Sequence, residues 1–164
     1  MTSELIAHEA ATKTELYTSL GSQLRSLLEG ERDLIANAAN LSSLLFYSLT
    51  DVNWVGFYFF KGAELVLGPF QGKPACVRIS LGSGVCGTAA QQRQTILVDN
   101  VHEFPGHIAC DSASNSEIVV PIVSGERLVG VLDLDSPSFS RFNEEDAKGL
   151  NDLIAIFVRA TEVS

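Results

Sequence analysis

Two segments near the N-terminus carry apolar side chains at every third or fourth position. The first segment ends before Gly30 and contains Leu16, Leu20, Leu24, Leu27 and Leu28. The second segment extends to about Leu49 and contains Leu34, Ala38, Leu41 and Leu45. Side chains at this spacing share one face of a helix. The pattern therefore predicts two amphipathic helices.

From Asn53 onward the apolar period changes to two, which is typical of β-strands. The aromatic run 53–60 predicts a first strand, and Lys61-Gly62 predicts a turn into a second strand at Glu64–Leu67. Further strands are expected at Cys76–Ser80 and Thr95–Val98, with a short helix at Val85–Gln92 between them. We expect these strands to form one sheet.

The C-terminal third predicts a β-hairpin followed by a helix. Glu117–Val123 and Arg127–Asp135 flank a short turn, whereas Asp99–Ser116 has no period and predicts a long loop of the kind that often carries function. Asn143 precedes three acidic residues and an apolar stripe, as a helix cap does. Together the elements predict an α+β fold with helices packed on a mostly antiparallel sheet.

Composition narrows the possible classes of protein. A length of 164 residues fits one domain, and 46% hydrophobic with 19% charged residues is a globular composition. The formal net charge of −9 repels phosphate backbones, so we expect no nucleic-acid partner. No apolar run approaches the roughly 20 residues that span a bilayer, and residues 1–11 lack the features of a signal peptide. We therefore expect a cytoplasmic protein without a membrane partner.

Residues 82–87 match the pattern G-x-G-x-x-G between a predicted strand and a predicted helix. In dinucleotide-binding folds this pattern opens a βαβ unit. Here the helix is short and a hairpin follows it, so we interpret the segment as a tight strand-to-helix turn.

Two groups of residues could line a ligand site. Trp54, Gly56 and Tyr58 share one face of the first strand. They fit an ordinary core, but the glycine between two aromatic residues could also leave room for a ligand above the sheet.

The second group is acidic. Asp133 and Asp135 share one face of the hairpin, and Glu117 lies roughly opposite them. They could be a solvated strand end. Alternatively, they could share a proton or bind a cation such as an ammonium group.

The chain has three cysteines: Cys76, Cys86 and Cys110. Buried, inert thiols are the commonest fate of free cysteine. However, Cys110 lies in the polar loop, and Cys86 lies near a helix N-terminus, where a thiolate is stabilised. His102, His107 and Cys110 lack the ligand spacing of a structural zinc site. A redox role for the cysteines is therefore the more specific hypothesis.

Several segments carry a resemblance to a known family. They are residues 53–58, 68–76, 82–87, the loop Phe-Pro-Gly-His-Ile-Ala-Cys-Asp (104–111), 117–122 and 130–136. Together they resemble the free methionine-(R)-sulfoxide reductases from about residue 40 to 160. The intervals of 10 and 24 residues between the cysteines are the most specific feature. The resemblance implies a single GAF domain over residues 1–164, with a six-stranded, mostly antiparallel sheet.

The resemblance also implies a role for each candidate residue. Cys110 would be the catalytic thiol, Cys76 the usual resolving thiol, and Cys86 a third thiol that relays or substitutes. Trp54 and Tyr58 would pack the methylsulfinyl end of the substrate. Glu117, Asp133 and Asp135 would hold the amino group and polarise the sulfoxide.

The implied reaction needs no metal or organic cofactor. A Cys110 sulfenic acid would form, condense with Cys76 to a disulfide, and be recycled by a dithiol such as thioredoxin. Because GAF domains often dimerise, a homodimer is also expected. The competing hypotheses are a GAF sensor, for which we see no output domain, and an assembly module, which would leave the cysteines unexplained.

Overall fold

A computed structural model describes residues 11–106 and 113–163 of the chain. Its helices are α1 (Lys13–Leu27), α2 (Leu34–Ser48), α3 (Gly84–Gln92) and α4 (Glu144–Ala160), with a 3-10 turn at Val101–Glu103. Its strands are β1 (Trp54–Lys61), β2 (Glu64–Gln71), β3 (Arg78–Ser80), β4 (Ile96–Val98), β5 (Ser116–Ser124) and β6 (Arg127–Ser136). Within this part of the chain, no helix is both long enough and apolar enough to cross a bilayer.

The six strands form one sheet in the order β3-β2-β1-β6-β5-β4. Every neighbouring pair is antiparallel. Residues 124–127 close the hairpin of β5 and β6, and the long pairing of these strands fixes their register. The predicted α+β fold with a six-stranded antiparallel sheet is confirmed.

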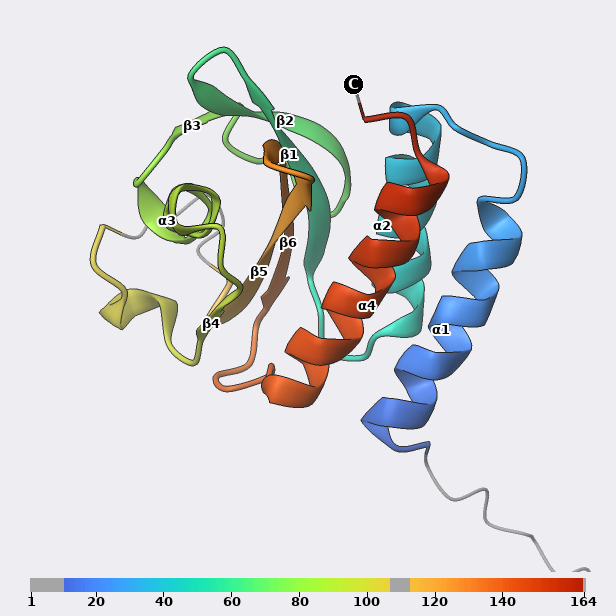
Figure 1. Cartoon of the computed structure of the whole chain (residues 1–164). Coiled ribbons are helices and arrows are strands. Elements are labelled where there is room, and N and C mark those ends of the chain that lie inside the picture. Colours follow the sequence, from blue (N-terminus) through green and yellow to red (C-terminus); the bar gives the residue numbers. More distant parts are fainter. Residues whose placement is uncertain (1–10, 107–112, 164) are drawn as a thin grey trace, which may run out of the picture.

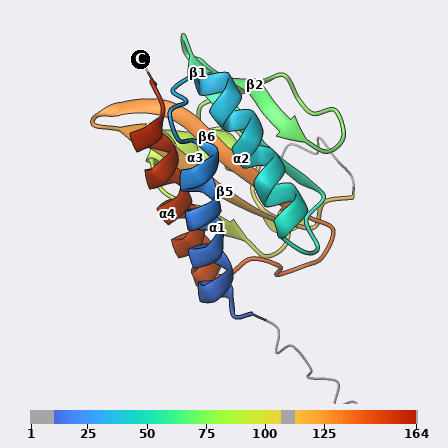
Figure 2. The same cartoon turned by 90° about the vertical axis from the view of Figure 1, so that its right-hand side faces the viewer.

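The two faces of the sheet have different covers. Helices α2 and α4 pack on one face, and α1 lies outside α4 (Figure 1). Figure 2, turned by 90°, shows α1 in front of the sheet between α2 and α4. The opposite face is covered by α3, and it carries a second apolar cluster that includes Trp54, Tyr58, Val119 and Val131. The candidate site residues of β1 lie on this second face.

Strand β2 is longer than predicted, because it continues to Gln71 instead of ending at Leu67. The prediction stopped before Gly68 and Pro69, which interrupt a strand pattern. In the structure, β3 pairs only with Glu64–Val66 of β2. Gly68 and Pro69 also lie at a register shift in the pairing of β2 with β1, and a β-bulge tolerates a proline.

Two other predictions of local structure were wrong. The third strand was expected to begin at Cys76 but covers only Arg78–Ser80, so Cys76 lies in the irregular segment before β3. Leu27 belongs to the predicted stripe of the first helix, yet it is 45% exposed, because it lies at the end of α1.

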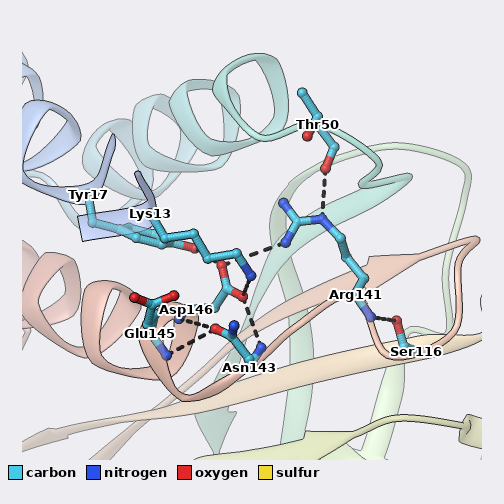
Figure 3. Close-up of polar contacts among 8 residues, drawn as sticks. All are labelled: Lys13, Tyr17, Thr50, Ser116, Arg141, Asn143, Glu145 and Asp146. Atoms are coloured by element: carbon cyan, nitrogen blue, oxygen red, sulfur yellow. Dashed lines mark hydrogen bonds and ion pairs between the residues drawn. The ribbon is translucent and has the colours of Figure 1, made fainter. Parts of the chain in front are cut away.

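A buried ionic network fixes α1 to the start of α4 (Figure 3). Asp146 is 1% exposed and accepts hydrogen bonds from Lys13 and, at 2.8 Å, from the Tyr17 hydroxyl. Arg141 lies 3.6 Å from the same carboxylate and donates to the Thr50 carbonyl at 2.9 Å. The Asp146 carboxylate also completes the capping box of α4 with Asn143. One side chain therefore holds three segments together.

We expect Asp146→Ala to lower the free energy of unfolding by about 3 kcal/mol, because it leaves two partly buried cations and the buried Tyr17 hydroxyl without this acceptor. Urea unfolding followed by circular dichroism measures the change. Asp152→Ala is the matched control, since Asp152 pairs with Lys148 on the exposed surface of the same helix. Its cost should stay within about 0.5 kcal/mol. Equal losses in the two variants would contradict the role given to Asp146.

Candidate active site

Strand β1 places its aromatic residues along one edge of a cavity. The rings of Trp54 and Tyr58 stack with centroids 6.0 Å apart, and Trp54 also stacks on Phe70 at 5.3 Å. The indole N–H donates to the Lys73 carbonyl at 3.0 Å, which fixes the ring. Both Trp54 and Tyr58 are buried and line the cavity. They form a rigid apolar wall.

Gly56 does not leave room for a ligand, contrary to one of the predictions. A Cβ atom at this position would lie 2.5 Å from the Trp54 ring and 2.4 Å from the Phe70 Cβ. The glycine is therefore required because the indole lies across the strand at this point. Its effect on the cavity is indirect, through the orientation of Trp54.

The three candidate carboxylates come together on the same face of the sheet. Glu117 of β5 lies directly opposite Asp135 of β6, and Asp133 pairs with Gly56 of β1 and Val119 of β5. Glu117 and Asp133 are each 6% exposed, while Asp135 is partly exposed. The alternative of a solvated strand end is therefore wrong for Glu117 and Asp133.

Burial and mutual repulsion change the titration of these acids. Burial, followed by the nearby charges of Asp133 and Asp135, raises the pKa of Glu117 well above its usual range. Burial also raises the pKa of Asp133. Glu117 and Asp133 therefore hold protons to higher pH than ordinary carboxylates do. A protonated acid that lines a cavity is the arrangement that general-acid chemistry requires.

Cys86 lies in the first turn of α3, and its Sγ is 3.9 Å from Oε1 of Glu117. The sequence predicted a stabilised thiolate here, and this prediction is wrong. Burial, together with the charges of Asp133 and Glu117, raises the pKa of the Cys86 thiol. These unfavourable effects outweigh any stabilisation by the helix N-terminus, so Cys86 remains a neutral thiol near pH 7.

The two other cysteines differ in what the structure describes. Cys76 is disulfide-bonded, and its backbone carbonyl accepts a hydrogen bond from the Tyr58 hydroxyl at 2.8 Å. The neighbouring residues Pro74 and Ala75 line the cavity. Cys110, the predicted catalytic cysteine, lies outside the described residues.

Hydrogen bonds connect the two described ends of the predicted long loop beside the cavity. His102 Nε2 lies 2.9 Å from Asn115 Oδ1, and the Asn115 amide donates to the Pro137 carbonyl at 2.7 Å. The side-chain amide of Asn53 donates to Ser114 at 3.4 Å, and Ser114 lines the cavity. His102 thus contacts Asn115 in the loop. His107 lies outside the described residues.

Residues 24–160 of the chain match the model of the GAF domain. The chain is also 54% identical over 143 residues to the free methionine-R-sulfoxide reductase of Escherichia coli (strain K12), and the match covers 87% of each chain. The chain belongs to the free methionine-R-sulfoxide reductases of the GAF family. The resemblance that the sequence carried is therefore confirmed.

Solved structures of this reductase family have the same fold. The structure of fRMsr of Staphylococcus aureus in its reduced form superposes with a TM-score of 0.86 at 50% identity, covering 88% of this chain and 94% of that one. The free methionine-R-sulfoxide reductase from Neisseria meningitidis in complex with its substrate gives a TM-score of 0.88 at 43% identity, covering 94% and 93%. The family relationship extends over most of both chains.

The cavity of this reductase-family member includes residues that the sequence did not single out as a site. Besides the predicted Trp54, Tyr58, Cys86, Glu117, Asp133 and Asp135, its lining contains Pro74, Ala75, Ile79, Ser83, Gly84, Val85 and Ser114. The glycine turn could have indicated part of this set. Gly82 and Gly84 have positive φ angles of 81° and 60°, as the predicted tight turn requires. The turn brings the first residues of α3 to the cavity wall.

The start of α3 lies at the cavity wall. The first amide groups of a helix have no acceptor within the helix. The Ser83 side chain makes no capping hydrogen bond, and Ser83, Gly84 and Val85 line the cavity. The cavity therefore offers backbone donors on one side and acids on another.

We expect Glu117 to lower the free energy of unfolding as pH rises above the ordinary pKa of a glutamate. An ordinary glutamate titrates near 4.5, while the folded state holds the pKa of Glu117 well above that value. Between the two pKa values the folded state binds more protons than the unfolded state, so the free energy of unfolding decreases with pH. Glu117→Gln should remove this contribution, which is at most about 1.4 kcal/mol per pH unit.

Urea unfolding at several values between about pH 5 and pH 8 measures this dependence. Glu126→Gln is the control, because it removes an exposed carboxylate from the hairpin turn. It should reproduce the pH dependence of the unmodified protein. If Glu117→Gln also reproduced it, Glu117 would not hold the extra proton.

Proposed function

We propose that this protein reduces free methionine-R-sulfoxide to methionine. The observation that supports this proposal most directly is the cavity. In it, the buried acids Glu117 and Asp133 lie beside the aromatic wall of Trp54 and Tyr58. The relative from Neisseria meningitidis, whose structure is a complex with its substrate, supports the proposal by its similarity in sequence and fold.

The substrate's groups match the walls of the cavity. The methylsulfinyl end fits against Trp54 and Tyr58, where apolar burial and the ring faces favour a methyl-bearing sulfur. The ammonium group fits among the acids, where it offsets the negative charge of Asp133 and Asp135. The carboxylate fits at the start of α3, where backbone N–H groups and the helix dipole favour an anion.

The proposed chemistry begins with attack of the Cys110 thiolate on the sulfoxide sulfur. Negative charge grows on the sulfoxide oxygen, and Glu117, whose pKa burial raises well above its usual range, donates a hydrogen bond or its proton to that oxygen. The oxygen is transferred to the Cys110 sulfur, which becomes a sulfenic acid as methionine leaves. The substrate sulfur gains two electrons and the Cys110 sulfur loses two.

Cys76 is the proposed resolving thiol. It attacks the sulfenic acid, forms a disulfide with Cys110 and releases water. The disulfide-bonded state of Cys76 supports its part in redox chemistry, whereas Cys86 is a free, buried thiol. The raised pKa of Cys86 makes it a poor attacking thiol near pH 7. We therefore assign it no obligatory step.

We further propose that a cytoplasmic dithiol protein such as thioredoxin restores the two thiols. We propose as well that the whole chain acts as one domain, because α1, which begins before the matched residues 24–160, is fixed to α4 by Asp146. A homodimer remains part of the proposal on the basis of the family. Size-exclusion chromatography with light scattering tests it directly.

A coupled assay with NADPH, thioredoxin reductase and thioredoxin tests the function. The separate R and S epimers of free methionine sulfoxide are the substrates, and methionine is quantified by amino-acid analysis. The R epimer should support continuous NADPH oxidation with one methionine formed per NADPH, and the S epimer should not. A folded, reduced protein that binds the R epimer without forming methionine would favour the GAF-sensor alternative.

A further inference from the structure

One cluster in the cavity unites a sulfur ligand with two oxygen ligands from three different elements. Cys86 comes from α3, Glu117 from β5 and Asp133 from β6. One ligand atom of each residue lies within 4.8 Å of the other two, and all three residues are buried. Among the described residues, this is the set of three whose donor atoms converge closely enough to hold a metal ion.

A second observation indicates that the cluster can accept a cation. Oδ1 of Asp133 is buried and accepts no hydrogen bond from an N–H or hydroxyl group among residues 11–106 and 113–163. The side chains that interact with the Asp133 carboxyl are the acidic groups of Glu117 and Cys86. Asp133 is 6% exposed and lines the cavity. A buried carboxylate oxygen without such a donor is costly. An ion in the cavity would supply the missing interaction.

The donor set and its spacing fit zinc. Zinc binds thiolate sulfur at about 2.3 Å and carboxylate oxygen at about 2.0 Å, so tetrahedral coordination separates sulfur and oxygen by about 3.5 Å. The Cys86 Sγ and Glu117 Oε1 are 3.9 Å apart, and a small side-chain adjustment closes the difference. Mixed sulfur and oxygen ligands disfavour magnesium and calcium, which take oxygen ligands almost exclusively.

We propose that Cys86, Glu117 and Asp133 bind a zinc ion in a tetrahedral site whose fourth position takes water, and that this ion excludes the substrate's ammonium group. On binding, the Cys86 thiol and the protonated Glu117 carboxyl each lose a proton to solvent, and the sulfur and the carboxylate oxygen become ligands. The exclusion of substrate rests on the proposed function, whereas the metal site does not. Zinc is an inhibitor in this proposal and takes no part in turnover.

Isothermal titration with zinc alone tests the site. The protein is used in its oxidised state, with Cys76 disulfide-bonded as in the structure, so that a reduced Cys76 thiol adds no competing ligand. One zinc should bind per chain, and Cys86→Ser or Asp133→Asn should each weaken binding at least about 100-fold, because even outer groups around a metal matter about 10- to 100-fold. Circular dichroism establishes that each variant is folded.

Asp135→Asn is the matched control, because Asp135 lines the same cavity but does not belong to the converging set. It removes the same charge as Asp133→Asn without removing a ligand, and it should weaken zinc binding by less than about tenfold. If both aspartate variants lost zinc affinity equally, the loss would reflect only the removal of a negative charge, and the proposed site would be wrong. Unchanged affinity in folded Cys86→Ser would overturn it as well.

Displacement tests the second part of the proposal. Free methionine-R-sulfoxide should raise the apparent dissociation constant for zinc in the oxidised protein, where no turnover takes place. The S epimer at the same concentration corrects for chelation of zinc by the amino acid itself. If zinc binds through the cluster but both epimers have equal effects, the exclusion is wrong. Zinc binding that depends on Cys86 and Asp133 in a protein without reductase activity would support the metal site and contradict the proposed function.

Discussion

Replacing Cys110 by serine should reduce methionine formation to background, a loss of at least about 1000-fold. The reaction needs a thiolate that attacks the sulfoxide sulfur and then carries the transferred oxygen. A serine hydroxyl is far less acidic, and it cannot be oxidised to a sulfenic acid under these conditions. Quantifying methionine with excess dithiothreitol as the reductant isolates this step from thioredoxin recycling.

The other cysteines provide matched controls for this prediction. Cys76→Ser should keep the first turnover of methionine but lose cycling with thioredoxin, because only the resolving step is removed. Cys86→Ser should retain both, since the buried Cys86 thiol has a raised pKa and carries no obligatory step. A first turnover that survives in Cys110→Ser and disappears in Cys86→Ser would show that the nucleophile was misassigned.

The strands that form the site could be predicted because their apolar patterns are strict. The alternation in residues 53–60 correctly placed Trp54 and Tyr58 on one face of β1. Counting back through the short turn between β5 and β6 correctly brought Glu117 roughly opposite Asp133 and Asp135. A register shift between Ile122 and Val123, which the count does not include, places it directly opposite Asp135. Alternation and turn length are local properties of a sequence. They determine which side chains share a face.

The environment of each site residue could not be predicted in the same way. Gly56 gave the same pattern whether the space above it held a ligand or an indole ring, and only tertiary packing put Trp54 there. The position of Cys86 near a helix start suggested a stabilised thiolate. In the structure, Glu117 and Asp133 from distant strands and the burial of the thiol reverse that effect. The position of a residue on its strand or helix follows from the local sequence. Its contacts and its pKa depend on residues that are distant in the sequence.

The start of α3 illustrates a third limit. The G-x-G-x-x-G pattern correctly predicted a tight turn, and Gly87 confirms close packing, because a Cβ there would lie 2.3 Å from the Ser80 carbonyl oxygen. The sequence alone did not indicate that Ser83 and Gly84 line the cavity. That position follows from how α3 packs across β5 and β6. The glycines of a turn predict the turn itself, but they do not predict which part of the protein its amide groups face.

Acetylating the amino group of the substrate should lower kcat/KM at least about 100-fold, because the cavity is built around a cation. Glu117 and Asp133 are buried, and Oδ1 of Asp133 accepts no hydrogen bond from an N–H or hydroxyl group among the described residues. The free ammonium group supplies that oxygen with a charged donor, whereas an acetamide supplies one weak neutral donor and adds bulk. Sites with buried polar groups reject analogues that leave those groups unpaired. Steady-state rates with free and N-acetylated methionine-R-sulfoxide measure the ratio.

A second analogue separates the ammonium group from the carboxylate. The methyl ester of methionine-R-sulfoxide keeps the ammonium group and removes only the negative charge that the start of α3 would bind, so it should be reduced faster than the N-acetyl compound. Asp133→Asn should then narrow the gap between free and acetylated substrate, chiefly by slowing the free compound, because the group that prefers a cation has lost its charge. Equal rates for the free and acetylated compounds would exclude ammonium binding by these acids. If the methyl ester were reduced more slowly than the N-acetyl compound, the start of α3 would be the dominant recognition element.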